Sequence, residues 1–339
     1  MTCKVKKELG YPIYGIGWVG DEIIVTGGGG GTSKSGVSNN ITTTRVKPDF
    51  SLEEIDNFSL ARGDDAVMSM DVQTGGSIIA GINGVAGKRN EHMRVFAVNE
   101  GHISEVTRRE LFTPREGTDD YQKATRLSAD GSSLLLLSAM NELVLLKDDY
   151  SKIAFRLSLT DILDADISLD GAQVAVVFSN EIAIFNDEGT RIKSFDAPPN
   201  MSFRHARFTK ESIIASAQTR IQRTSSIISI DLLSSSFSSR KLGRFSITAL
   251  DVSSEWIACA TSDFGIVFLS PKLRIHARSE AVATFTITRL SFDPAGKRLA
   301  CASVDTSMSV FEPPSTNSRY LLYMFIFLLL IALSYHYTQ

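Results

Sequence analysis

The sequence predicts an all-β fold, a seven-bladed WD40-like β-propeller, followed by a single C-terminal transmembrane helix. Three observations support this prediction. A unit of about forty residues recurs along the chain, the strand-like runs are short and separated by Asp-Gly-type turns, and one long apolar stretch lies at the C-terminus. Short strands at a fixed period near forty are typical of propeller blades. A chain of 339 residues is long enough for one large domain or two ordinary ones.

The repeat is clearest in the second half of the chain. Each unit has an apolar anchor residue just before its turn, and the spacings between successive anchors are 40, 41, 42 and 40 residues. The anchors are Leu127, Ile167, Phe208, Leu250 and Leu290. Asp130, Asp170 and Asp293 lie in the repeated turns, where a structural role is expected. No Trp-Asp dipeptide occurs in the chain, so the repeats are degenerate.

Two longer units come before these five and bring the expected number of blades to seven. The first runs from Tyr14 to Val46, and the second holds Ser69–Val72 and ends at Arg94–Val98. The N-terminal segment Thr2–Leu9 is expected to form the outer strand of the last blade and so close the ring.

The C-terminal residues predict a membrane anchor. The segment Tyr320–Gln339 contains no Asp, Glu, Lys or Arg, and Leu321–Leu333 is continuously apolar. A helix of about 18 residues crosses a hydrocarbon core of about 27 Å. Arg319 before the span places the propeller in the cytosol by the positive-inside rule. The alternative is a buried core helix. The expected division is a propeller at 1–312, a linker at 313–319, a transmembrane helix at 320–337 and a lumenal end at 338–339.

Composition and scattered reactive residues argue against several function classes. The formal net charge of -3 disfavours a nucleic-acid partner that needs a basic surface. Cys3, Cys259 and Cys301 have no metal-ligand spacing, and the last two occupy matching places in their repeats, as small buried residues would. The five histidines form no ligand or catalytic motif. No covalent enzyme chemistry is therefore expected.

The glycine-rich segment Gly27–Asn40, GGGGGTSKSGVSNN, is the best candidate for a functional element. It lies between two strand-like runs, Glu22–Thr26 and Ile41–Val46, which a two-residue turn could join. Five consecutive glycines suggest backbone that approaches something closely or adopts positive φ. A flexible hairpin tip is the simpler alternative. A phosphate-binding P-loop is disfavoured because Ser33 replaces its second glycine and a strand, not a helix, follows.

Together these features resemble one family. The segment Tyr11–Gly15, the glycines Gly28–Gly31 followed by Gly36–Asn39, the propeller and the C-terminal span resemble the guanine-nucleotide exchange factor of the endoplasmic reticulum membrane that starts COPII coat assembly. This is the Sec-twelve or prolactin regulatory element-binding family. The chain differs from the family pattern in one additional glycine and in an almost absent lumenal segment.

The resemblance implies a function, a location and a set of residues. The function is GDP release from the SAR-type small GTPase, which starts vesicle budding and transport toward the Golgi. The location is the endoplasmic reticulum membrane, with the Golgi membrane as a second site, and the propeller faces the cytosol. A potassium ion is implied to order the loop, with Asn39 offering a side-chain oxygen. The implied exchange-loop residues are Gly28, Gly29, Gly30, Gly31, Lys34, Gly36, Val37, Asn39 and Asn40.

Three further expectations follow from these readings. Lys34 is equally well read as a residue that faces phosphate or acidic switch residues and as a solvated loop lysine. Alanines in place of Gly28–Gly31 are expected to abolish exchange and to leave the blades intact. The alternative function is a membrane-anchored propeller scaffold that assembles protein partners without exchange activity.

Overall fold

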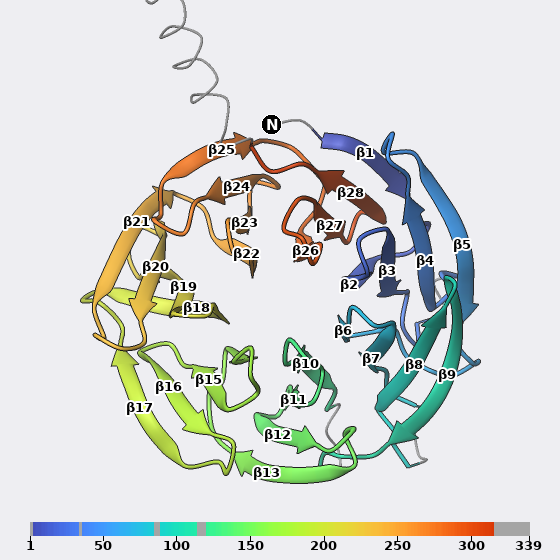
Figure 1. Cartoon of the computed structure of the whole chain (residues 1–339), viewed down its shortest axis with the longest axis horizontal. Helices are drawn as coiled ribbons and strands as arrows, with labels where there is room; N and C mark the ends of the chain where they lie inside the picture. Colours follow the sequence, from blue (N-terminus) through green and yellow to red (C-terminus); the bar gives the residue numbers. More distant parts are fainter. Residues whose placement is uncertain (1–2, 34–35, 85–88, 114–119, 315–339) are drawn as a thin grey trace, which may run out of the picture.

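The protein forms a ring of seven antiparallel sheets around a central axis (Figure 1). The computed structural model describes residues 3–33, 36–84, 89–113 and 120–314. Within these residues the chain has 28 β-strands, four in each sheet. In each of the first six blades the strands follow chain order, and the first strand lies nearest the axis. The predicted seven-bladed propeller is confirmed for the described part of the chain.

The seven blades follow one another along the chain. Blades 1 to 4 comprise β2 (Ile13–Val19), β3 (Ile23–Gly28), β4 (Asn40–Val46) and β5 (Leu52–Ser59); β6 (Ser69–Val72), β7 (Ser77–Gly81), β8 (Met93–Asn99) and β9 (His102–Arg109); β10 (Gln122–Leu127), β11 (Leu134–Ser138), β12 (Glu142–Lys147) and β13 (Lys152–Ser158); and β14 (Asp164–Ile167), β15 (Gln173–Val177), β16 (Glu181–Asn186) and β17 (Arg191–Asp196). Blades 5 to 7 comprise β18 (Met201–Phe208), β19 (Ser212–Thr219), β20 (Ser225–Asp231) and β21 (Phe237–Gly243); β22 (Ile247–Val252), β23 (Ile257–Thr261), β24 (Ile266–Leu269) and β25 (Ile275–Ser279); and β26 (Ile287–Phe292), β27 (Leu299–Ser303), β28 (Ser307–Phe311) and β1 (Cys3–Glu8).

The N-terminal strand closes the ring, as the sequence predicts. β1 pairs antiparallel with β28, in a register that runs from Val5 opposite Val310 to Glu8 opposite Ser307. The Lys7 ammonium also lies 2.8 Å from a carboxylate oxygen of Glu54 on β5, the outer strand of blade 1. The last blade is therefore built from both ends of the described chain.

The middle strands of each blade carry the core because they are covered on both sides by neighbouring blades. Leu134–Leu137 on β11 and Leu143–Leu146 on β12 are buried without interruption. Outer strands instead alternate between buried or half-buried and exposed positions, as in β17. Continuous apolar runs inside and alternation outside are the patterns expected for two-sided and one-sided burial.

The repeat has a different register in the last two blades from the one predicted. Leu127, Ile167 and Phe208 are the last residues of their inner strands. The equivalent residues in blades 6 and 7 are Val252 and Phe292, because they are the ones paired with the first residues of β23 and β27. The anchors Leu250 and Leu290 lie two residues earlier. The first two units are also longer than expected, since each ends with a fourth strand, β5 or β9.

Strand connections alternate between the two faces of an antiparallel blade. The connections between second and third strands, and those that lead into the next blade, therefore leave from one side, which we call the loop face. The described parts of the β3–β4 connection, the segment 60–68 and residues 82–84 and 89–92 belong to it. Hydrogen bonds join these segments directly, from Leu60 N to Asn39 O at 2.9 Å and from Asp65 N to Asn83 O at 2.8 Å.

The predicted membrane span lies outside the described residues. Pro313 and Pro314, at the start of the expected linker, follow β28 without regular structure. The rest of the linker, the helix expected at 320–337 and the expected lumenal end are not described. In residues 3–33, 36–84, 89–113 and 120–314, no helix has the length and hydrophobicity to cross a bilayer.

Candidate functional site

The glycine-rich loop connects β3 to β4 on the loop face, and it is shorter than the sequence suggests. Gly28 pairs with Asn40, and Gly27 with Ile41, so these four residues belong to the strands. The loop itself comprises residues 29–39. The two strands predicted on either side of it are confirmed, each extended toward the loop. Gly28 and Asn40, which the sequence predicts as exchange-loop residues, are therefore strand ends that hold the loop at its base.

The segment Tyr11–Pro12 forms the floor beneath the start of the loop. The backbone N–H of Gly29 donates to the carbonyl of Pro12 at 3.0 Å. A Cβ atom at Gly28 would lie 1.9 Å from that same oxygen, so no larger residue fits there without moving backbone. The expectation that alanine is harmless to the blades at all four glycines is therefore wrong for Gly28, because the clash lies between strands of blade 1.

Tyr11 fixes that floor from below. Its hydroxyl donates to Thr42 Oγ1 at 2.7 Å and lies 3.1 Å from Thr26 Oγ1. The ring is buried with Ile13, and burial raises the pKa of the Tyr11 hydroxyl, which stays protonated. The early aromatic-proline segment is thus structural support for the loop.

Asn39 holds the loop together across its mouth. Its Oδ1 accepts the N–H of Gly31 at 2.9 Å, and its Nδ2 donates to the carbonyls of Gly31 and Asp64, at 3.1 and 2.9 Å. A Cβ atom at Gly29 would lie 2.1 Å from the same Oδ1, and Gly29 has a φ of 145°. Glycine is therefore required at position 29 by close approach and by backbone conformation together.

A buried ion pair fixes Asp64, the residue whose carbonyl accepts the hydrogen bond from Asn39 Nδ2. Arg94 donates from Nη1 and Nη2 to the two carboxylate oxygens of Asp64, at 2.5 and 2.7 Å, and both side chains are buried. Such two-point pairs have fixed geometry. Asp64 in turn presents its carbonyl to Asn39. The loop is tied through this pair to β8 of blade 2. The sequence reasoning missed both residues.

The remaining predicted loop residues lie at different depths. Val37 is half-buried and packs against the apolar cluster that contains Tyr11 and Ile13. Gly36 is exposed with a φ of 77°, and the carbonyl of Gly30 accepts a hydrogen bond from Ser33 Oγ at 2.6 Å. Lys34 lies outside the described residues, so its role remains a prediction.

Oxygen atoms at the base of the loop suit a hard cation. Asn40 Oδ1 is buried and has no hydrogen-bond partner among the described residues, while its Nδ2 donates to Ser38 Oγ at 3.0 Å. Asn39 Oδ1, the predicted ligand, already accepts one hydrogen bond, which leaves one lone pair. Amide oxygens are ligands for hard cations, so each of these two oxygens has the chemistry that the implied ion needs. In the described segments no three His, Cys, Asp or Glu side chains gather as a metal cluster.

The other residues singled out by sequence have structural places. Cys259 and Cys301 are buried at matching positions of β23 and β27, and burial raises the pKa of each thiol. The Asp130 and Asp170 carboxylates accept hydrogen bonds from serines of their own turns. Asp293 is the first residue of its turn, and it accepts the backbone N–H of Lys297.

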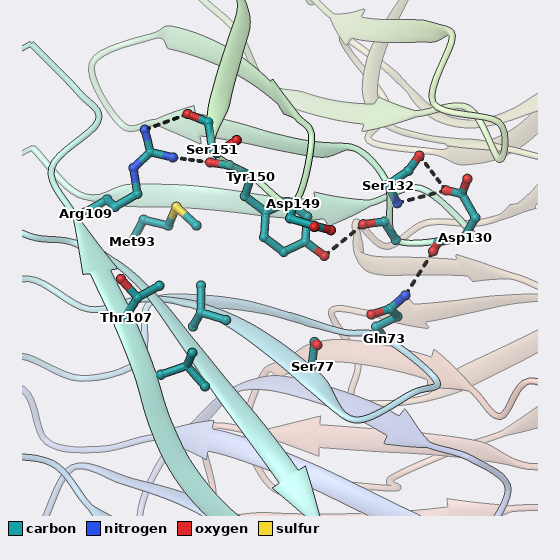
Figure 2. A pocket seen from close by; sticks show the side chains of 13 residues that line it. Gln73, Ser77, Met93, Thr107, Arg109, Asp130, Ser132, Asp149, Tyr150 and Ser151 are labelled. Atoms are coloured by element: carbon teal, nitrogen blue, oxygen red, sulfur yellow. Dashed lines mark hydrogen bonds between the residues drawn. The ribbon is translucent and has the colours of Figure 1, made fainter.

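One cavity of the described structure is remote from the glycine-rich loop. It has a volume of about 640 Å³ and lies between blades 2 and 3, next to the turns 128–133 and 148–151 of the opposite face (Figure 2). The polar residues that line it form hydrogen bonds with one another. Arg109 donates to the carbonyls of Tyr150 and Ser151, and the Tyr150 hydroxyl donates to the Gly131 carbonyl at 2.9 Å.

Comparison with known proteins agrees with this geometry. No protein-family model matches the chain. It is 24% identical over 331 residues to the guanine nucleotide-exchange factor SEC12 of Candida glabrata, which covers 91% of this chain and 72% of that protein. It is also similar to two proteins named putative guanine nucleotide-exchange factor SED4. Identity is 22% over 340 residues for the Saccharomyces cerevisiae protein and 24% over 344 residues for that of Candida glabrata.

These alignments span 93% and 92% of this chain but only 31% and 32% of the SED4 proteins, so the chain spans about a third of their length. Among solved structures, the C-terminal WD40 domain of Sif2 superimposes with a TM-score of 0.61 at 14% identity, over 93% of this chain and 100% of that one. That likeness confirms the fold alone. The similarity to the named exchange factors extends along nearly the whole chain, with 22–24% identity over 91–93% of its residues.

Proposed function

We propose that this protein is a guanine-nucleotide exchange factor for a small GTPase, and that the loop at residues 29–39 acts on the GTPase. The observation that carries the proposal is the combination of exposed, side-chain-poor backbone with firm anchoring at both ends. Pro12 and Asn39 hold the loop, while Thr32, Ser33, Gly36 and Ser38 are exposed. The names of its relatives support the same activity.

An exchange factor accelerates nucleotide release by binding the nucleotide-free GTPase more tightly than the nucleotide-bound form. No covalent bond is made or broken. A loop that enters the partner's nucleotide pocket must not lose much conformational entropy on binding, and a loop ordered beforehand loses less. The hydrogen bonds of Asn39 to Gly31 and Asp64 supply that order. The glycines let the backbone approach the partner closely.

The partner we propose is the SAR-type small GTPase, so that the protein starts COPII vesicle budding from the endoplasmic reticulum. The support is the resemblance of Tyr11–Gly15 and of the loop to that family. The apolar stretch at 320–337 would hold the propeller at the cytosolic side of the membrane. A tether in the thin layer where a membrane-associated GTPase also lies raises their effective concentration.

A potassium ion at the base of the loop is part of the same proposal. Asn40 Oδ1 and the second lone pair of Asn39 Oδ1 are the side-chain oxygens that would hold it. When bound, the ion would supply a positive charge that draws loop oxygens together. Asn40 is the stronger ligand of the two, because its buried oxygen lacks a partner and loses nothing by binding.

Release of mant-GDP from the SAR-type GTPase tests the proposed activity, with the full chain in detergent or liposomes. Acceleration that grows with the concentration of the protein is expected. If the protein binds the GTPase without any acceleration, it is a scaffold and the exchange proposal is wrong.

A further inference from the structure

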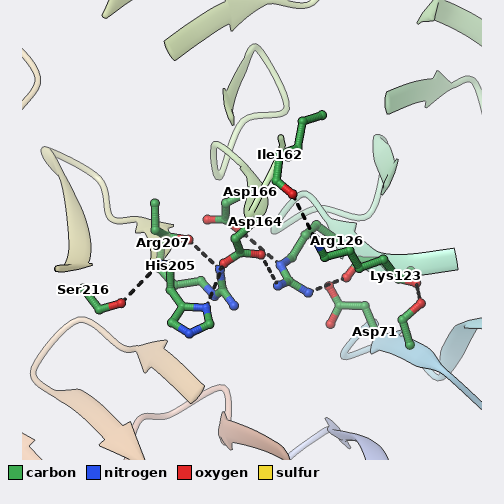
Figure 3. A network of polar contacts seen from close by, with 12 residues as sticks. Asp71, Lys123, Arg126, Ile162, Asp164, Asp166, His205, Arg207 and Ser216 are labelled. Atoms are coloured by element: carbon green, nitrogen blue, oxygen red, sulfur yellow. Dashed lines mark hydrogen bonds and ion pairs between the residues drawn. The ribbon is translucent and has the colours of Figure 1, made fainter. Parts of the chain in front are cut away.

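The central channel of the propeller contains a cavity of about 180 Å³ with an unusual set of walls. The inner strands of blades 3 to 7 contribute residues to its walls. Figure 3 shows the polar contacts among several of these residues, including Arg126, Asp164 and Arg207. Its charged and titratable lining residues are Lys123, Arg126, Asp164, His205, Arg207 and Arg289. Four cationic side chains thus face a cavity that has a single carboxylate in its wall.

That carboxylate is shared among several donors. Asp164 Oδ1 lies 3.2 Å from Arg126 Nη2, and Asp164 Oδ2 lies 2.7 Å from Arg207 Nη1. His205 Nδ1 is 3.5 Å from the same Oδ2. Burial and then the charges of Arg207 and Arg289 lower the pKa of Arg126 to about 9. The arginines therefore repel one another around a carboxylate that cannot neutralise them all.

Two carboxylates lie deeper in the channel, and neither offers both of its oxygens to the arginines. Asp166 and Asp251 each use one oxygen to accept a backbone N–H of the next blade, from Phe208 and Phe292, at 2.7 Å. Asp166 Oδ1 is 3.4 Å from Arg126 Nε. Burial raises the pKa of Asp166 to about 6 and that of Asp251 above its usual range.

Two donors in the wall have no acceptor. The side chain of Arg289 forms no hydrogen bond or ion pair with any described residue, although the residue is half-buried. The hydroxyl of Thr248 is buried and has no hydrogen-bond partner among the described residues. An unpaired buried donor is costly, and it becomes satisfied when an acceptor enters the cavity. These two groups point to an anionic ligand, independently of the arginine pairs.

We propose that the central channel binds a phosphate-type oxyanion between Arg126, Arg207 and Arg289. The three arginines come from blades 3, 5 and 7 and therefore surround the axis from three directions. A tetrahedral oxyanion presents oxygens in three directions at once, whereas one planar carboxylate presents two. Guanidinium groups are the side chains best suited to phosphate oxygens. The cavity volume corresponds to about six waters at about 30 Å³ each, enough for one phosphate group with little water.

The cavity lies toward the loop-face ends of the inner strands, because Asp164, Thr248 and Thr288 are at or next to the first residues of β14, β22 and β26. Lys123 Nζ donates at 2.9 Å to the carbonyl of Ile162, in the connection that leads into β14. That connection belongs to the same face as the glycine-rich loop. The oxyanion site is separate from the exchange loop, and its existence does not depend on exchange activity.

Isothermal titration of the full chain with inorganic phosphate at pH 7.4 tests this inference. One phosphate per chain and a higher Tm with phosphate are expected. Acetate at the same concentration should bind far more weakly. Arg289→Gln should weaken phosphate binding by about tenfold or more, the effect of one charge-assisted contact. Thr248→Val should weaken it by a smaller factor. Arg240→Gln, on the exposed outer strand β21, is the matched control and should bind phosphate as the unchanged protein does.

Glycerol 3-phosphate distinguishes the two sources of the ligand. Binding of phosphate but not of the ester identifies free phosphate, and binding of both identifies a phosphate group carried on a larger molecule. The inference is overturned if phosphate gives neither heat nor stabilisation, if acetate binds as tightly as phosphate, or if folded Arg289→Gln and Thr248→Val proteins retain full affinity.

Discussion

Asn39 binds Gly31 through both sides of one amide, with Oδ1 2.9 Å from the Gly31 N–H nitrogen and Nδ2 3.1 Å from the Gly31 carbonyl oxygen. This is the pattern that a neighbouring strand would offer, supplied by a side chain. A loop with five exposed or half-buried small residues thereby gains a fixed cross-link without a strand partner. Replacing either residue should affect the loop before it affects the blades.

Asn39→Ala should lower the rate of mant-GDP release by about tenfold or more and change the Tm by only a few degrees. The substitution removes hydrogen bonds that contribute about 1 kcal/mol each, and they lie on the loop face, outside the cores of the blades. The exposed Asn57→Ala on β5 is the control. A folded Asn39→Ala protein with unchanged exchange would mean that the loop does not act on the GTPase.

Gly29→Ala and Gly36→Ala should have unequal effects on exchange. Both residues have positive φ, but a Cβ at position 29 meets Asn39 Oδ1, whereas a Cβ at position 36 has no atom within 4 Å. Alanine at position 36 pays only the backbone cost of about 1 kcal/mol. Exchange should be nearly lost in the first variant and largely kept in the second. Equal activities would show that the contact with Asn39 is not what orders the loop.

Asp64→Asn should destabilise the protein by about 3 kcal/mol or more, because it leaves the buried guanidinium of Arg94 without its countercharge. The exposed pair of Lys47 and Glu53, 3.0 Å apart, provides the control, and Glu53→Gln should leave the Tm unchanged. Thermal unfolding followed by circular dichroism measures both. Exchange should fall with Asp64→Asn even at temperatures where the protein is folded, since Asp64 positions Asn39.

Replacing potassium by sodium at constant ionic strength should slow nucleotide release by the full chain. Asn40→Ala should remove most of this cation dependence, because it deletes the buried oxygen that has no partner. The rates are measured with the same GTPase preparation in both salts, with intrinsic release subtracted. Identical rates in potassium and sodium would show that no potassium ion orders the loop. The proposal that the loop acts on the GTPase would still stand.

Lowering the pH below 6.5 should destabilise the fold through His92. The His92 Nε2 accepts the backbone N–H groups of Leu111 and Phe112, at 3.2 and 3.1 Å, so the ring is neutral. Burial lowers the pKa of His92 below its usual 6.5. The unfolded chain therefore takes up a proton below pH 6.5 that the folded chain does not, and stability falls by up to about 1.4 kcal/mol per pH unit.

Stability against pH for His92→Gln, with the exposed His102→Gln as control, measures this contribution. The His92 variant should lose part of the decline between pH 6.5 and 5, and the His102 variant should follow the unchanged protein. A decline of the same steepness in all three proteins would assign acid sensitivity to other groups.

The blades were predictable because each one repeats the same buried strands and the same turn. Their exact register was not. Leu250 and Val252 are two residues apart on β22 and therefore face the same side of the sheet. A shift of two keeps every apolar residue on its side, so alternation alone cannot choose between them. Only the pairing of Val252 with Ile257 settles the register.

The loop was predictable in sequence and its support was not. Glycines and Asn39 stand together in the chain, but Asp64 and Arg94 are thirty residues apart, the first in the β5–β6 connection and the second on β8. No pattern in the sequence pairs two opposite charges that are this far apart in the chain. They meet because the β5–β6 connection passes beneath the loop, a long-range consequence of the ring.

Closure of the ring by β1 makes the order of synthesis important. Cys3 is opposite Phe311, 308 residues later, so β1 leaves the ribosome long before its partner strand β28 is made. At about 5–20 residues per second, this wait lasts roughly 15 to 60 s. Until then β1 has no partner and the ring cannot be completed, although earlier blades can already pair within themselves. A translation stop after β25 and before residue 311 therefore leaves six complete blades and an exposed sheet edge, a substrate for quality control rather than a smaller functional propeller.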